Sequence, residues 1–161
     1  MAQIKQLEAI TSQLEYPVKT RAGFDRLVMI DSLVVKKTRE AELKKQYSYL
    51  LTYQKSALQW AEKQGTLEEV LQAKLMLARF HEKMANNITA IQLGEELLNY
   101  EENLRPNQMA DVVFLVANAY TKMEAYNEVL ALEPLAEKYF TEENGYLKQG
   151  YTSAERIGMT Y

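Results

Sequence analysis

The sequence predicts an all-α protein of stacked, antiparallel helical hairpins, and three observations carry this prediction. Helix-favouring Ala, Leu, Glu, Lys and Gln dominate the 161 residues, whereas only 6 Gly and 3 Pro are present, too few turn formers for a many-stranded sandwich or barrel. Apolar residues fall at helical spacing along almost the whole chain, and no segment alternates convincingly as a strand does. A short pattern also recurs at a nearly constant interval, which is typical of a helical solenoid.

The recurring pattern is an apolar residue, a small residue and, three positions further on, an aromatic ring. Its copies are Leu77-Ala78-x-x-His81, Val116-Ala117-x-x-Tyr120 and Ile157-Gly158-x-x-Tyr161. Their first residues are 39 and 41 positions apart, and the small residues would let neighbouring helices approach closely. The third copy stops at the last residue, so we expect this chain to be a piece of a longer solenoid.

The first half of the chain predicts four helices. Pro17 separates the first two, because the residue before a proline avoids helical geometry, and Gly65 ends the third. Thr66 is followed three positions later by Glu69, a capping box that opens the fourth helix. The expected helices cover residues 3–14, 18–35, 37–64 and 67–84.

The second half predicts four more helices, joined by short turns. Asn86-Asn87 forms the first turn, Pro106 limits the helix before it, Asn107 caps the next helix, and Asn144-Gly145 breaks the chain again. The expected helices cover residues 88–104, 107–123, 126–140 and a last stretch from 147 or 153 to 161.

Pro134 falls inside the expected helix 126–140, where it removes a backbone donor. Either the helix kinks there, or a second short helix begins with Pro134 in its first turn. We expect the kink, because Leu130, Leu135 and Tyr139 keep helical spacing across it.

The net charge and the amino-acid composition limit the kinds of partner and the cellular location that we expect. A net charge of −3 and a pI near 5.4 argue against nucleic acid as the partner of this domain, because phosphate contacts need a basic face. The chain has no cysteine, which agrees with a reducing compartment such as the cytoplasm; a periplasmic location would require that an export signal had been removed. No apolar stretch approaches the roughly 18 residues of a membrane span.

The residue types argue against an enzyme. His81 is the only histidine, so no multi-histidine metal site or histidine-paired nucleophile can be assembled, and we expect it to be packed or half-exposed. Neighbouring carboxylates such as Glu95-Glu96 point to different faces of a helix. No glycine-rich phosphate loop is present. We therefore expect no cofactor and no catalytic site.

The pattern resembles the tetratricopeptide repeat, in which Leu-Gly/Ala-x-x-Tyr lies on the first helix of a helix–turn–helix unit. The best copy runs over 116–126, and the run over 53–65 looks like the second helix of an earlier repeat. Ala57, Leu97 and Ala136 share one second-helix position at intervals of 40 and 39. The period is near 40 rather than 34, as in longer-period members from bacterial sensor and regulatory proteins, and His81 replaces a tyrosine.

The resemblance implies a right-handed superhelix (an α-solenoid) in a single domain over residues 1–161. Residues 46–145 match best, residues 1–45 are divergent, and residues 146–161 would start a further repeat or form a capping helix. It further implies that first helices line a peptide-binding groove. Carried over residue by residue, the groove candidates are Gln72, Leu75, Met76, Arg79, Glu82 and Lys83, then Asp111, Phe114, Leu115, Asn118, Thr121 and Lys122.

Two functions follow as expectations. The first is a non-catalytic module that binds a protein or peptide, as the sensing or docking part of a larger bacterial regulatory protein. The alternative is a structural scaffold that forms a homodimer through its C-terminal helix, without a peptide ligand. The aromatic stripe of Tyr49, Tyr53 and Trp60 is expected to lie in the core between helices rather than on a docking surface.

Overall fold

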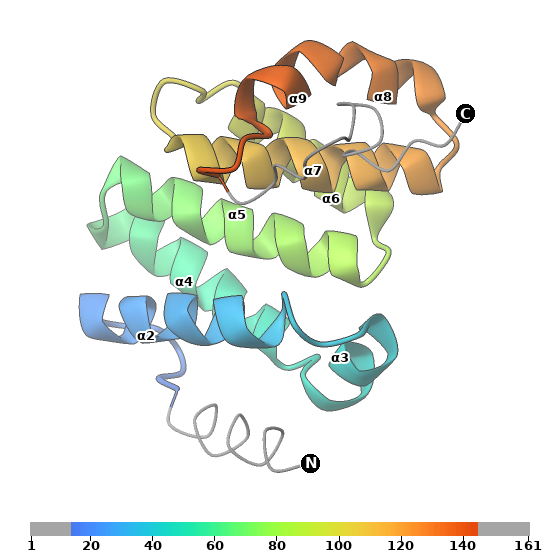
Figure 1. Cartoon of the computed structure of the whole chain (residues 1–161). Helices are drawn as coiled ribbons and strands as arrows, with labels where there is room; N and C mark the ends of the chain where they lie inside the picture. The colour runs from blue at the N-terminus through green and yellow to red at the C-terminus, as the bar shows by residue number, and fades with distance from the viewer. Residues whose placement is uncertain (1–13, 145–161) are drawn as a thin grey trace. The chain divides into compact units, whose positions relative to one another are not determined.

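The computed structural model describes residues 14–144, which form eight α-helices and no strand (Figure 1). The all-α prediction is therefore confirmed for this part of the chain. The expected terminal helices and the third copy of the pattern fall outside it, in residues 1–13 and 145–161. Contacts divide the chain into two compact units, unit 1 (residues 1–84) and unit 2 (residues 85–161). Within residues 14–144, no helix is both long enough and apolar enough to cross a membrane.

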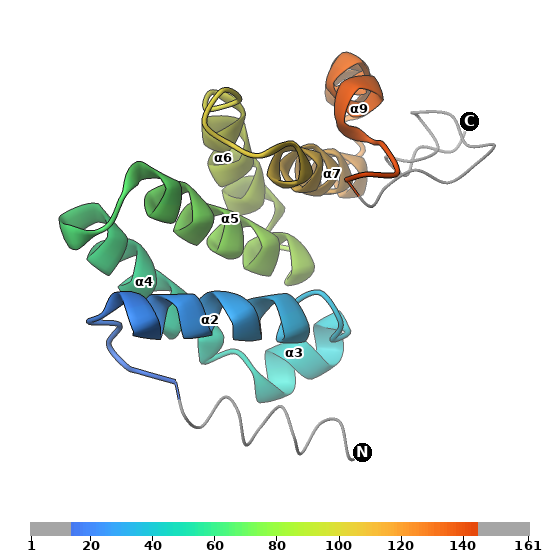
Figure 2. The same cartoon turned by 60° about the vertical axis from the view of Figure 1, so that its left-hand side comes forward.

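In unit 1, one helix packs against a pair of neighbouring helices (Figure 2). α4 and α5 pack along each other, and α2 packs on both of them. Phe24 and Leu27 of α2 are buried together with Leu50 and Trp60 of α4. The helices of the unit are α2 (Arg21–Val34), α3 (Glu40–Gln46), α4 (Leu50–Gln64) and α5 (Leu67–Lys83).

The capping box at the start of α5 is confirmed. Thr66 N donates to Glu69 Oε1 at 2.9 Å, and Glu69 N donates to Thr66 Oγ1 at 3.2 Å. Glu69 also accepts two hydrogen bonds of 3.0 Å from the Arg21 guanidinium, which lies 5.4 Å from the centre of the Trp60 ring. The residue that starts α5 therefore also ties it to the start of α2.

The single helix expected over 37–64 is wrong, because the chain turns between α3 and α4. Leu50 N donates to Tyr47 O, and Thr52 N donates to Tyr49 O. Each of these hydrogen bonds spans three residues, whereas the hydrogen bonds of an α-helix span four. The turn contains Tyr, Ser and Tyr, which favour a helix less than the residues around them. Leu43, Tyr47 and Leu50 are all buried and keep helical spacing across the turn, so the apolar pattern did not reveal it.

Unit 2 is built around α7, which contacts every other helix of the unit. Gly94 of α6 faces Val116 of α7, and a Cβ added at Gly94 would lie 2.2 Å from Val116 Cγ2. The two helices therefore approach more closely than any side chain at this position would allow. The helices of the unit are α6 (Asn87–Leu98), α7 (Pro106–Lys122), α8 (Tyr126–Ala131) and α9 (Glu133–Tyr139).

Two expected boundaries in unit 2 are wrong. α6 ends at Leu98 rather than at 104, and turns follow that bring Leu104 into the core. α7 begins at Pro106 with Arg105 as its N-cap, so Asn107 is not the cap. Proline suits the first helical position because the missing N–H would have no partner there, and Arg105 N instead donates to Gln108 Oε1 at 3.0 Å.

The expected kink at Pro134 is also wrong, since two separate helices meet at Leu132. α8 closes with a three-residue hydrogen bond from Leu132 N to Val129 O at 3.0 Å, and Ala136 N then donates to Leu132 O at 2.9 Å. Pro134 lies in the first turn of α9, where its lack of an N–H costs no hydrogen bond.

The 39-residue period appears directly in the helix boundaries. α5 and α7 begin at 67 and 106 and end at 83 and 122, and α6 and α8 begin at 87 and 126. The turns agree too: Ala85 and Glu124, also 39 apart, have left-handed φ angles of 61° and 59°. Ala78 and Ala117 are completely buried, as are Ala57, Leu97 and Ala136. The helix starts and the left-handed turns therefore repeat at 39 residues, although α6 is one helix and its counterpart is divided into α8 and α9.

We predict that Gly94→Ala destabilises unit 2. Glycine to alanine inside a helix normally gains about 1 kcal/mol, but here the new methyl group meets the stiff, fully buried side chain of Val116. The cost of this overpacking, about 1–3 kcal/mol, should exceed the gain in helix propensity. Thermal and urea unfolding followed by circular dichroism measure it, with the exposed Gln92→Ala as control. Val116→Ala should cost less in the Gly94→Ala background than alone, and independent costs would contradict the close approach.

We predict that Glu124→Gly stabilises the protein by about 0.5–1 kcal/mol, because glycine adopts the left-handed geometry without the penalty of a Cβ. Glu128→Gly, inside α8, should instead destabilise by about 1 kcal/mol. The same unfolding measurements test both. Equal losses for the two variants would show that the turn after α7 is not left-handed.

Candidate functional site

The groove candidates on α5 separate into buried and partly exposed side chains. Leu75 and Met76 are completely buried, and Met76 belongs to the apolar core of unit 1. These two residues present no surface to a ligand in this structure. The partly exposed members are Gln72, Arg79, Glu82 and Lys83.

Arg79 is held by a buried carboxylate instead of lining an open wall. Its Nη1 lies 3.8 Å from Oδ2 of Asp31, and the two side chains are 15% and 1% exposed. Gln54, also buried, donates from Nε2 to Asp31 Oδ1 at 2.5 Å. One residue from each of α2, α4 and α5 therefore meets in this cluster. Of these three residues only Arg79 is a groove candidate, although Asp31 stands in the sequence as a charge among the apolar residues of α2.

The Asp31 carboxyl is unusual in its acidity. Burial raises its pKa to about 6 from an ordinary 3.8, against the lowering effects of Arg79, of the Gln54 hydrogen bond and of Lys36. Perturbed carboxyl groups occur at catalytic sites and in structural ion pairs alike. Asp31 faces the Arg79 guanidinium at 3.8 Å, so the cluster joins α2 to α5 as a structural ion pair does.

The groove candidates on α7 are divided in the same way. Leu115 is buried, whereas Lys122 is exposed. Phe114 packs edge-on against Phe140, with ring centres 6.3 Å apart, and the Thr121 hydroxyl donates to Ala117 O at 2.8 Å. Phe114 and Thr121 thus serve the fold of unit 2. Asp111 and Asn118 are partly exposed.

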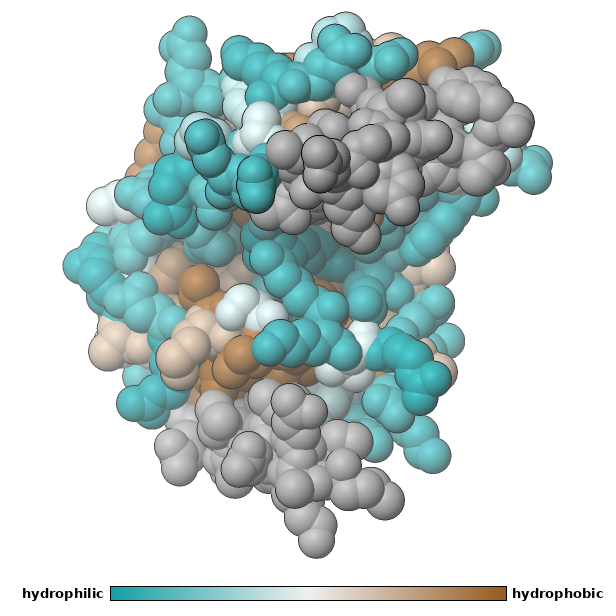
Figure 3. All heavy atoms as spheres, viewed as in Figure 1, coloured by the Kyte–Doolittle hydropathy of each residue, from teal (hydrophilic) through white to brown (hydrophobic). Residues whose placement is uncertain are grey.

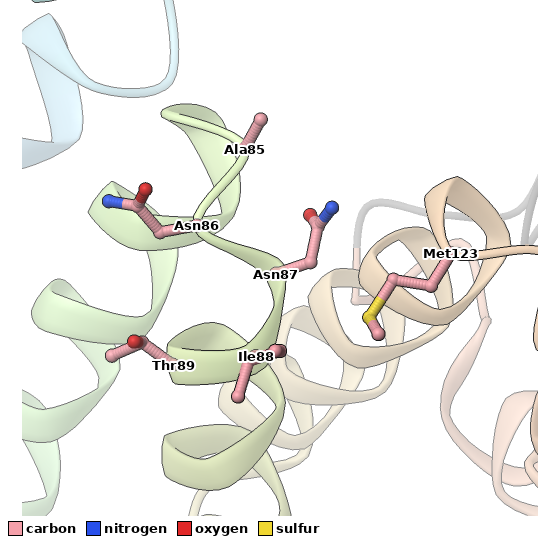
Figure 4. A pocket seen from close by; sticks show the side chains of 6 residues that line it. All are labelled: Ala85, Asn86, Asn87, Ile88, Thr89 and Met123. Carbon is pink, nitrogen blue, oxygen red and sulfur yellow. The ribbon is translucent and has the colours of Figure 1, made fainter.

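An open depression of about 390 Å³ in unit 2 is a candidate binding site (Figure 4). It lies between the start of α6 and the end of α7, and the groove prediction did not include it. In Figure 4, Asn87 points toward Met123, whereas Asn86 and Thr89 point away from it. None of its lining residues is charged: Ala85, Asn86, Asn87, Ile88, Thr89 and Met123.

Large apolar side chains are exposed around this depression. Ile88 is 63% exposed and Met123 46%, and Tyr126 and Leu130 follow on α8 with 47% and 42%. Tyr126 and Leu130 are four residues apart on α8, which places them on one face of that helix. The sequence predicts a turn at residues 86 and 87 and a helix that begins at 88. Because a turn or a helix start does not indicate which side chains are exposed, the sequence did not predict this depression.

A smaller depression of about 240 Å³ lies in unit 1 beside α4. Trp60, Lys19 and Lys63 line it together with neutral residues, and no acidic residue does. Hydrophilic residues cover most of the described face in Figure 3, and a few hydrophobic residues show between them around α2. Trp60 itself is only 7% exposed, so it lies in the core as expected, whereas Tyr49 of the same stripe is 38% exposed and lies at the surface.

His81 is partly buried, as expected, and its ring meets Phe80 edge-on at 6.2 Å. Burial, with a smaller effect of Lys55, lowers the pKa of His81 below its ordinary 6.5. Across residues 14–144, no three His, Asp or Glu side chains come together as a metal site would require.

Comparison with protein-family models, with curated proteins and with solved structures finds no significant match to this chain.

We predict that Arg79→Met destabilises unit 1 by about 3 kcal/mol at pH 7.5, because it leaves the buried Asp31 carboxylate without its counter-charge. Urea unfolding followed by the fluorescence of Trp60, the single tryptophan and a core residue of unit 1, measures the loss. Lys83→Met on the same helix is the control and should change stability by less than about 1 kcal/mol. Similar losses for both variants would contradict a structural role for the ion pair.

Proposed function

We propose that this protein is a non-catalytic helical-repeat module, similar to tetratricopeptide repeats, that binds a protein or peptide segment. The observation that carries the proposal is the helix–turn–helix segment repeated at 39 residues, with matching boundaries and matching left-handed turns. Repeated segments of this kind stack into solenoids whose surfaces bind other chains. The right-handed superhelix and a role within a bacterial regulatory protein belong to this proposal.

The depression of unit 2 is the contact site that we assign to the ligand. Exposed apolar side chains beside uncharged amides suit a peptide that inserts a large apolar residue and pairs its backbone with asparagine. The absence of charge among the six lining residues favours a neutral segment over an acidic or basic one. Thr121 and Lys122, at the end of α7, are the groove candidates of unit 2 closest to it along the chain.

We predict that replacing Ile88 and Met123 together by lysine weakens peptide binding at least tenfold. Peptides are first selected from a displayed random library against the wild-type chain, and their Kd values are then measured by fluorescence anisotropy. Two lost apolar contacts of about 1 kcal/mol each exceed the 1.4 kcal/mol that corresponds to a factor of ten. The matched control replaces Met29 and Leu67, which are 55% and 49% exposed in unit 1, and should bind like the wild type.

Equal binding by wild type, variant and control would overturn the assigned site. A second copy of the chain is the competing occupant, as in the scaffold alternative. Sedimentation equilibrium distinguishes the two: a tight dimer that the Ile88 and Met123 replacements dissociate, together with a failure to select any peptide, would favour the scaffold.

A further inference from the structure

The polar cluster of unit 1 contains two buried acceptor atoms that lack a donor. Asp31 Oδ1 accepts from Gln54 Nε2, but Asp31 Oδ2 and Gln54 Oε1 have no hydrogen-bond partner. Asp31 is 1% exposed and Gln54 is completely buried. Leaving such groups unsatisfied in the interior is costly, so each one requires an explanation.

The ion pair with Arg79 does not supply the missing donor. The 3.8 Å between Arg79 Nη1 and Asp31 Oδ2 is a favourable charge contact, but it is too long for a hydrogen bond. A single proton on Oδ2 satisfies both atoms at once. The acid O–H then donates to Gln54 Oε1 while Gln54 Nε2 continues to donate to Oδ1, which closes a ring of two hydrogen bonds between a carboxylic acid and an amide.

We propose that Asp31 and Gln54 form a buried proton-binding site, whose occupancy decides whether α2 is held to α4 by the acid–amide pair or to α5 by the charge of Arg79. Arg79 is the charged group that faces the site from α5, and Gln54 faces it from α4 without a charge. Lys36, just beyond the end of α2, adds a weaker positive influence. The inference concerns unit 1 and does not depend on the peptide site of unit 2.

The acidity of the group agrees with this geometry. The pKa of about 6 in the folded chain is higher than the 3.8 of an ordinary aspartic acid. Folding therefore favours the protonated form of Asp31. The contribution of this protonation to the free energy of unfolding is complete below pH 3.8 and is lost as the pH rises through 6. With a pKa of about 6 in the folded chain and 3.8 in the unfolded chain, the unfolding constant rises about tenfold between pH 5 and pH 7.5.

His81 would act in the opposite direction over part of the same range. Its folded pKa is lowered, so its contribution to stability falls as the pH falls. The change of the total free energy of unfolding with pH therefore contains two opposite contributions, one from Asp31 and one from His81. The comparison of the wild type with Asp31→Asn, in which His81 is unchanged, isolates the Asp31 contribution.

Asp31→Asn imitates the protonated state, because asparagine can form the same two hydrogen bonds with Gln54. The experiment is urea unfolding from pH 5 to 7.5, followed by the fluorescence of Trp60, which lies 5.4 Å from Phe24 of α2 between ring centres. The unfolding constant of the wild type relative to Asp31→Asn should fall about tenfold from pH 7.5 to pH 5. Asp25→Asn, an exposed carboxyl on the same helix, should run parallel to the wild type.

A carbon-13 NMR titration of the Asp31 carboxyl provides a second, direct measurement. It should titrate near pH 6 in the wild type and at a higher pH in Arg79→Gln, because the charge of Arg79 favours the ionised form. Parallel unfolding curves for wild type and Asp31→Asn, or a carboxyl that titrates below about pH 4.5, would overturn the proposal.

Discussion

The burial of one carboxyl group constrains the arrangement of unit 1. Asp31 points from α2 into the space where α4 and α5 meet, and a group of this kind must find a hydrogen bond and a counter-charge or lose its charge. Gln54 meets the first need and Arg79 the second, which fixes how these three helices face one another. Apolar packing alone would tolerate several rotations of α2 on the pair, since Leu27, Ile30 and Val34 offer similar surfaces.

A steric constraint has the corresponding role in unit 2. Contact between α6 and α7 depends on the missing side chain of Gly94 against Val116, whereas small, fully buried residues at Ala117 and Ala136 mark the repeat itself. Small residues and one buried charge are different solutions to one problem, that of specifying how helices with similar apolar faces should pack. Ala85 and Glu124, 39 residues apart, both adopt left-handed φ angles.

Sequence periodicity and capping chemistry predicted the helical class, most helix boundaries and the 39-residue period, because these depend on local spacing. The breaks after α3 and after α8 were missed, since Leu43, Tyr47 and Leu50 continue the apolar pattern through the first and helical spacing continues through Pro134. The groove assignment carried over from the resemblance included the buried Leu75, Met76 and Leu115. Which side of a first helix is covered depends on packing that a single-helix pattern does not contain. Asp31 is 48 positions from Arg79 and 23 from Gln54 in the sequence, and no local rule connects residues at such distances.

The two units therefore carry different kinds of information about function. In unit 2 the exposed Ile88 and Met123 line an uncharged depression, and the proposed peptide site rests on this arrangement. In unit 1 the polar cluster is buried, and replacing buried ion pairs by apolar residues of similar volume is often neutral or stabilising. A cluster that only held helices together could be replaced by leucines with a gain in stability. Unlike leucines, Asp31, Gln54 and Arg79 specify how the three helices face one another, and the proposed proton site on Asp31 adds a response to pH that an apolar core does not have.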